Sequence, residues 1–150
     1  MPEEISRLLL NGHDTIVRKW TEKVTADRRV RSDAHLTYIQ LVDHVPQIVE
    51  ELRHALTRNE RPEGAMLEEG RNHGRQRWQQ GYELKEVVRE LTLLRATLIE
   101  FLDTYRGAIR TQPDQLVQSY NRITGFMDEE IYKTVEAYLE APREVAHGNN

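Results

Sequence analysis

The residues best suited to chemistry gather in one segment, 69–78. His73 lies there between Gly70 and Gly74, and three arginines surround it: Arg71, Arg75 and Arg77. A histidine in an apolar core can serve as an axial haem ligand, and arginines bind phosphate or carboxylate groups. The structural alternative is a histidine hydrogen-bonded at a helix crossing, with arginines paired to acidic residues of neighbouring helices. We predict these structural roles and keep a haem-binding gas or redox sensor at His73 as the alternative.

The two glycines of this segment predict a close helix contact. Gly70 and Gly74 are one helical turn apart on the same face. Each costs about 1 kcal/mol relative to alanine inside a helix. That cost is understandable if the backbone of another helix packs against this face.

No other motif supports catalysis or metal binding. The chain has no cysteine, which excludes thiolate ligands and cysteine nucleophiles. Glu51 and His54 form a single Glu-x-x-His pair, whereas a di-iron bundle needs two such pairs and two further glutamates. The charged connection 27–31 is predicted to be a solvated loop, with an anion site as the alternative. We therefore predict no metal, no catalytic residue and no enzymatic activity in this domain.

A heptad stripe marks the segment that follows. Leu84, Leu91 and Leu98 repeat every seven residues, which is typical of a buried amphipathic helix. Arg95 interrupts the stripe, in register with Leu102. A charge in that position needs a partner or a route to water.

Arg95 has two interpretations. It can snorkel, with its stem packed and its guanidinium in solvent. Alternatively, it accompanies His73 and Arg77 in a polar pocket that senses an anion or anchors a switch. In that case Glu90, Asp43 or carbonyls near Gly81 are the expected acceptors.

Composition places these elements in one globular domain. The chain has 150 residues, of which 31% are charged, and its formal net charge is -4. This charge argues against a general nucleic-acid binder. No apolar run approaches the roughly 18 residues of a membrane span. The first residues, Met-Pro-Glu-Glu, show neither the basic nor the apolar region of a signal peptide, so we expect none. We expect a cytoplasmic protein that uses neither nucleic acid nor membrane as a partner.

The hydrophobic pattern predicts an all-α fold, a single bundle of six to seven helices. The expected helices are 2–10, 13–24, 32–42, 43–56, 65–80, 84–110 and 113–142. Pro142 is expected to end the last helix, which gives a domain at 1–142 and a polar tail at 143–150. Three consecutive acidic residues, Asp128 to Glu130, are expected to interrupt the surface of the last helix.

A spaced set of motifs resembles a known family. In order, these are Asp43-His44-Val45-Pro46, His73-Gly74-x-x-Arg77, Gly81-Tyr82 and the sequence ELTLLR at Glu90–Arg95. Together they resemble the N-terminal domain of RsbT co-antagonist proteins of the RsbRD type, which also occurs at the front of bacterial sensor histidine kinases. The similarity covers roughly residues 13 to 140.

This resemblance implies a sensory or regulatory domain that signals through its long final helix. The implied output is a C-terminal histidine kinase or a stressosome-type, anti-sigma-factor-antagonist domain. A globin-like arrangement without haem is offered by analogy with related stressosome sensors. We expect a homodimer, an output domain or downstream signalling protein as partner, and a small ligand or anion as a further possibility. The candidate ligand-binding or switch residues are Asp43, His44, His73, Arg77, Tyr82, Glu90 and Arg95.

Overall fold

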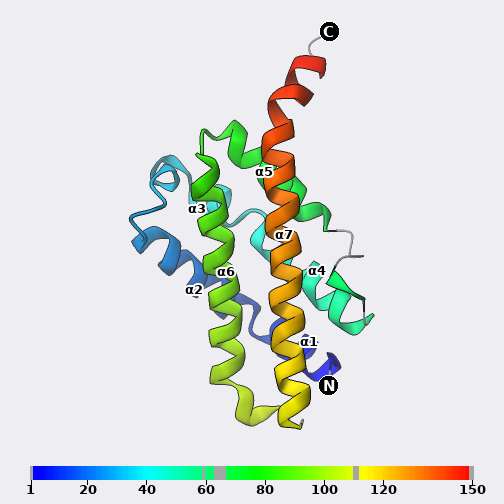
Figure 1. Cartoon of the computed structure of the whole chain (residues 1–150). Helices are drawn as coiled ribbons and strands as arrows, with labels where there is room; N and C mark the ends of the chain where they lie inside the picture. Colours follow the sequence, from blue (N-terminus) through cyan, green and yellow to red (C-terminus); the bar gives the residue numbers. More distant parts are fainter. Residues whose placement is uncertain (1, 59, 63–66, 110–111, 149–150) are drawn as a thin grey trace.

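The computed structural model describes residues 2–58, 60–62, 67–109 and 112–148. All regular structure in these ranges is helical and forms a single bundle, which confirms the predicted all-α class (Figure 1). The α-helices are α1 (Pro2–Asn11), α2 (His13–Ala26), α3 (Tyr38–Val42), α4 (Val45–Thr57), α5 (Glu68–Gln79), α6 (Leu84–Thr104) and α7 (Pro113–Gly148). Short 3₁₀ segments, η1 (Ser32–His35) and η3 (Arg106–Ala108), follow α2 and α6.

The bundle is built around α6 and α7, which run antiparallel and side by side (Figure 1). Helix α5 crosses the C-terminal half of α7, α2 packs on α6, and α1 packs on α4. Apolar side chains from these helices share one core, with Trp20, Ile48, Leu94, Leu98 and Phe126 almost fully enclosed. None of the described helices combines the length and apolar character needed to cross a membrane.

The α5–α7 crossing confirms the predicted glycine contact. A Cβ placed on Gly74 would lie 2.3 Å from the carbonyl oxygen of Thr134 on α7. The Thr134 hydroxyl also donates a 2.9 Å hydrogen bond to the Gly70 carbonyl. The absence of side chains at these glycines therefore lets two helix backbones touch.

Local sequence signals explain several helix boundaries. Gly81 separates α5 from α6 with a φ of 83°, a conformation that glycine adopts without the steric cost of a side chain. Pro46 lies in the first turn of α4, as expected, because an amide there has no partner within the helix. The predicted start of α5 at Ala65 lies outside the described residues.

Two expected helix boundaries and one expected buried position are wrong. The segment 32–42 is divided, because Thr37 and Gln40 form a capping box that starts a new helix, α3. Ile39, expected on the buried side, is 76% exposed. The helix expected to reach 110 ends at Thr104. Beyond it Tyr105 is exposed, and Gly107 has a low helix propensity that disfavours continuing the helix.

Helix α7 continues through Pro142 to Gly148, so the prediction that Pro142 ends it was wrong. Proline removes one backbone donor and disfavours a helical conformation at the preceding residue. Beyond the proline, Glu144 pairs with Arg75 on α5, with 3.1 Å between Arg75 Nε and Glu144 Oε2. The C-terminal part of α7 extends past the other helices (Figure 1).

Candidate functional site

The candidate site is centred on a buried arginine. Helix α5 places Arg77 so that its side chain is fully enclosed and its Nε donates a 2.9 Å hydrogen bond to Glu90 Oε1 on α6. Its Nη2 donates to the Leu41 carbonyl at 2.7 Å, and its Nη1 donates to Gln80 Oε1 at 2.6 Å and to the Gln40 carbonyl at 3.2 Å. A buried guanidinium cannot lose its charge, so these acceptors offset its desolvation.

Glu90 is held from two sides. Its carboxylate is fully buried beside Arg77, and its backbone carbonyl accepts a 2.9 Å hydrogen bond from Trp20 Nε1 on α2. The Oε2 atom has no hydrogen-bond partner among the described residues. Arg77 therefore supplies most of the compensation for this buried charge.

His73 lies one turn before Arg77 and faces the same carboxylate. Its Nε2 is 3.3 Å from Glu90 Oε1, but neither ring nitrogen makes a hydrogen bond of good geometry within the described part of the chain. Burial lowers the pKa of His73, and the nearby Arg77 charge adds to this effect. We therefore treat His73 as neutral and its approach to Glu90 as a polar contact, not an ion pair.

Tyr82 completes what we call the buried cluster, namely His73, Arg77, Tyr82 and Glu90. The Arg77 guanidinium lies 4.8 Å from the centre of the Tyr82 ring, within the range of a cation–π interaction. Burial, with the adjacent Glu90 charge, strongly raises the pKa of Tyr82. Its backbone carbonyl accepts a 2.5 Å hydrogen bond from the Tyr138 hydroxyl on α7. Tyr82 thus belongs both to the cluster and to the contact with α7.

His44 lies at the edge of the cluster. Its ring meets that of His73 edge to face, with 5.6 Å between the centres. His44 Nδ1 is 3.1 Å from Glu69 Oε2, and its Nε2 contacts Gln76 Oε1. Asp43 is exposed and lies 3.8 Å from His44 Nε2, so it reaches the cluster only through this histidine.

Arg95 is not part of the cluster, so of its two interpretations the one that places it in a pocket with His73 and Arg77 was wrong. Its side chain is 33% exposed and pairs with the exposed Asp128 on α7. The snorkelling interpretation is therefore the correct one, since the charged end reaches the solvent-exposed edge between α6 and α7. The other arginines of α5 behave as the structural interpretation predicts: Arg71 Nη2 lies 2.9 Å from Glu140 Oε2, and Arg75 pairs with Glu144.

The surroundings of His73 do not fit a haem. An axial ligand must turn one ring nitrogen toward an open apolar cavity. The His73 side chain is instead 1% exposed, and its Nε2 faces the carboxylate of Glu90. No cluster of three or more His, Asp or Glu residues in the described ranges is arranged to hold a metal ion. Glu51 and His54 do not act as a pair either, because His54 Nε2 lies 3.2 Å from Glu50 Oε1 instead.

A second buried polar group was missed from the sequence. Glu130 on α7 is 2% exposed, although it was expected on the surface. Burial and the neighbouring Glu51 charge raise its pKa well above the ordinary value, and burial also raises the pKa of Glu51. The Glu51 carboxylate accepts a 3.2 Å hydrogen bond from the Glu69 amide at the start of α5. Neither carboxylate oxygen of Glu130 has a hydrogen-bond partner among the described residues, so burial favours its protonated form. A periodicity count could have found Glu130, which continues the buried positions Ile123 and Met127.

Comparison with known proteins identifies a family for this chain. The family model described as the RsbT co-antagonist protein rsbRD N-terminal domain matches residues 14–149, nearly the whole chain. Searches of curated proteins and of solved structures give no match. The matched region contains every helix of the buried cluster, together with α7. This chain belongs to the family of RsbT co-antagonist protein rsbRD N-terminal domains.

Proposed function

We propose that this chain is the signal-input domain of a bacterial stressosome-type regulator, and that it passes a change to an output domain through α7. The proposal rests on the family membership and on the contact between the buried cluster and α7. The domain itself is proposed to regulate, not to catalyse. The output partner is proposed to be an anti-sigma-factor-antagonist domain or a histidine kinase, acting in the cytoplasm.

The hydrogen bond from Tyr138 to Tyr82 is the observation that carries this proposal. It joins α7 directly to a residue whose ring lies against the Arg77 guanidinium. A change that moves Arg77 or Glu90 therefore displaces an attachment point of α7. Packed helices respond to such changes by small rigid shifts.

The rest of the α5–α7 interface makes this attachment stiff. The backbones meet at Gly74 and Thr134. The arginines of α5 also form ion pairs with acidic residues along α7, with Arg71 Nη2 2.9 Å from Glu140 Oε2. Close backbone packing leaves little room for independent motion. We propose that α5 and the C-terminal half of α7 move as one unit.

We also propose a homodimer formed along α7. Tyr132 and Leu139 are 62% and 60% exposed and lie seven residues apart on one face, with half-buried Val135 between them. An exposed apolar stripe of this kind is typical of an interface. Two-fold pairing would hold the two C-terminal segments side by side, where attached output domains could respond to their separation. Light scattering should give twice the chain mass; a mass near 17.6 kDa at all micromolar concentrations would contradict this pairing.

The proposed function can be tested in the bacterium that carries the gene. Gly74→Ala should force α5 and α7 apart, whereas Gly107→Ala meets nothing within 4 Å and serves as the matched control. A stress-response reporter should change its basal or induced level with Gly74→Ala and stay unchanged with the control, at equal protein abundance. Unchanged reporter output in both variants would refute the proposed role.

A further inference from the structure

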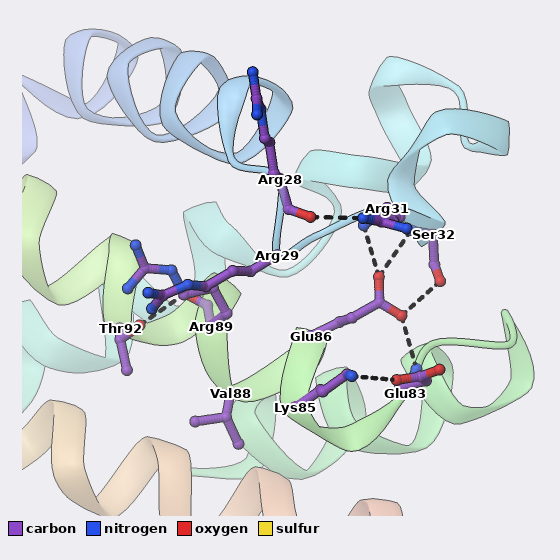
Figure 2. Close-up of a pocket in the computed structure, with 10 residues that line it drawn as sticks. All are labelled: Arg28, Arg29, Arg31, Ser32, Glu83, Lys85, Glu86, Val88, Arg89 and Thr92. Carbon is purple, nitrogen blue, oxygen red and sulfur yellow. Dashed lines mark hydrogen bonds and ion pairs between the residues drawn. The ribbon is translucent and has the colours of Figure 1, made fainter.

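A second site lies away from the buried cluster, in a cleft of about 730 Å³ between the α2–η1 connection and α6 (Figure 2). Five cationic side chains line it: Arg28, Arg29, Arg31, Lys85 and Arg89. Its acidic lining residues are Glu83 and Glu86. This concentration of positive charge contrasts with the net charge of -4 for the whole chain.

The carboxylate of Glu86 is already fully used inside the protein. It accepts hydrogen bonds from the amides of Arg31 and Ser32 at 2.7 and 2.8 Å and from the Ser32 hydroxyl at 2.7 Å. It also accepts from the Glu83 amide at 3.0 Å. Glu86 therefore fixes the shape of the connection. Its partners are neutral amides and a hydroxyl, so it keeps its negative charge, and the lining carries five cationic against two acidic side chains.

Asp27 fixes the other end of the connection. It accepts a 2.7 Å hydrogen bond from the Arg29 amide and a 2.8 Å hydrogen bond from Arg89 Nε. Val30, between the two anchored ends, is buried in the core. The backbone under the cleft is thus held in place before any ligand arrives, which reduces the entropic cost of binding.

The arginines of the connection make no close ion pair within the described part of the chain. Among the described residues, no ion pair involves Arg28, Arg29 or Arg31. Figure 2 shows the Arg29 side chain extending from the connection toward Arg89, and both arginine charges act on Asp27. Lys85 pairs only with Glu83, at 3.2 Å and with both side chains exposed, an arrangement that contributes little.

We propose that this cleft binds a small molecule carrying a diphosphate or longer polyphosphate group. The cleft volume falls in the range of small-molecule sites. Figure 2 shows the Arg29 side chain directed toward Arg89 on α6 and that of Arg28 directed away from Glu86. One carboxylate could pair with only part of the cationic lining, whereas linked phosphates present several anionic oxygens to it. Arginine forks match phosphate geometry. This site is separate from the buried cluster, and its occupancy does not depend on the proposed function.

Calorimetric titration of the chain with inorganic pyrophosphate and with ADP tests the proposal. Arg29→Gln is the informative variant, because its side chain holds no ion pair that the fold needs. Arg18→Gln on α2 is the control: it removes the same charge from an exposed position outside the cleft lining. We expect saturable binding, weakened about tenfold by Arg29→Gln, the size of one charge-assisted hydrogen bond. Arg18→Gln should leave the affinity unchanged.

Three results would overturn the assignment. The first is no binding of pyrophosphate or ADP at millimolar concentration. The second is equal weakening by Arg29→Gln and Arg18→Gln, which would show a general charge effect. The third is tight binding of an acidic peptide such as oligoglutamate with none of pyrophosphate, which would make the cleft a protein-docking surface. A second variant, Lys85→Gln, should also weaken pyrophosphate binding if the cleft is the site.

Discussion

The Tyr138 hydroxyl on α7 donates a 2.5 Å hydrogen bond to the backbone carbonyl of Tyr82, 56 residues earlier in the chain. The ring of the same Tyr82 lies beneath the buried guanidinium of Arg77. This single contact therefore links the most deeply buried charges of the domain to its longest helix. The predictions that follow test this link and the groups around it.

Gly74→Ala should destabilise the fold by about 1–3 kcal/mol, the usual cost of overpacking a core. The added Cβ would lie 2.3 Å from the Thr134 carbonyl oxygen and 3.1 Å from the Tyr138 amide nitrogen, and backbone atoms cannot rotate away. Urea unfolding monitored by circular dichroism measures the change. Gly107→Ala is the control, and equal stability of the two variants would show that the helices do not meet at Gly74.

Arg77→Met should cost about 3–5 kcal/mol of unfolding free energy, because it leaves the Glu90 carboxylate buried without its partner. Arg95→Met makes the same chemical change at a half-exposed ion pair and should cost at most about 1 kcal/mol. Chemical denaturation of both variants gives the comparison. Adding Glu90→Leu to Arg77→Met should recover part of the loss, and similar costs for the two single variants would contradict the buried ion pair.

Glu86 should make the fold sensitive to acid. Burial alone would raise the pKa of Glu86, but hydrogen bonds from Ser32, Glu83 and Arg31 lower it from 4.5 to about 2. A carboxyl group with a lowered folded-state pKa stabilises the protein above its unfolded pKa, and this stabilisation is lost as the pH falls through the folded value. The contribution is on the order of 3 kcal/mol and should disappear between pH 4.5 and about 2.

The Glu86→Gln variant isolates this effect. It should be less stable than the parent at pH 7, and the difference should shrink as the pH falls toward 2. Denaturant midpoints at pH 7, 4 and 3 provide the test. A stability difference that does not vary with pH would show that Glu86 has an ordinary pKa.

Glu130→Gln should stabilise the domain at neutral pH. Burial and the Glu51 charge raise the pKa of Glu130, Glu69 acts in the same direction, and Lys133 opposes them. A carboxyl group with a raised folded-state pKa destabilises the fold as the pH rises above its unfolded value of 4.5. The amide cannot ionise, so Glu130→Gln should lose less stability than the parent between pH 5 and 8. Thermal unfolding across that range measures the effect, and a parallel pH dependence for both proteins would contradict a raised pKa for Glu130.

The sequence predicts the features that depend on local spacing. The helical class, the glycine contact and the turn at Gly81 follow from periodicity and glycine chemistry. So does the pairing of the α5 arginines with acidic residues. The family resemblance, carried by motifs between Asp43 and Arg95, is confirmed by the match over residues 14–149. The expectations of a globin-like arrangement and of a small ligand at the cluster stay predictions.

Features that depend on distant partners could not be predicted in the same way. Arg95 shares a heptad position with buried residues, but its surroundings depend on Asp128, 33 residues later. Glu130 stands in an acidic triplet that looks solvated, yet the 3.6-residue period turns only this member toward the core. Helix α7 continues through Pro142, and Glu144 beyond it pairs with Arg75, a partner 69 residues earlier that no local pattern encodes.

Amide hydrogen exchange along residues 134–144 of α7 tests the central claim most directly, because exchange reports local opening of each helix segment. The comparison uses the parent chain, Arg77→Met, Tyr138→Phe and the Arg95→Met control under native conditions. We expect faster exchange in this segment for Arg77→Met and Tyr138→Phe, and parental exchange for Arg95→Met. Unchanged protection of residues 134–144 in both Arg77→Met and Tyr138→Phe would show that the buried cluster and α7 are not coupled.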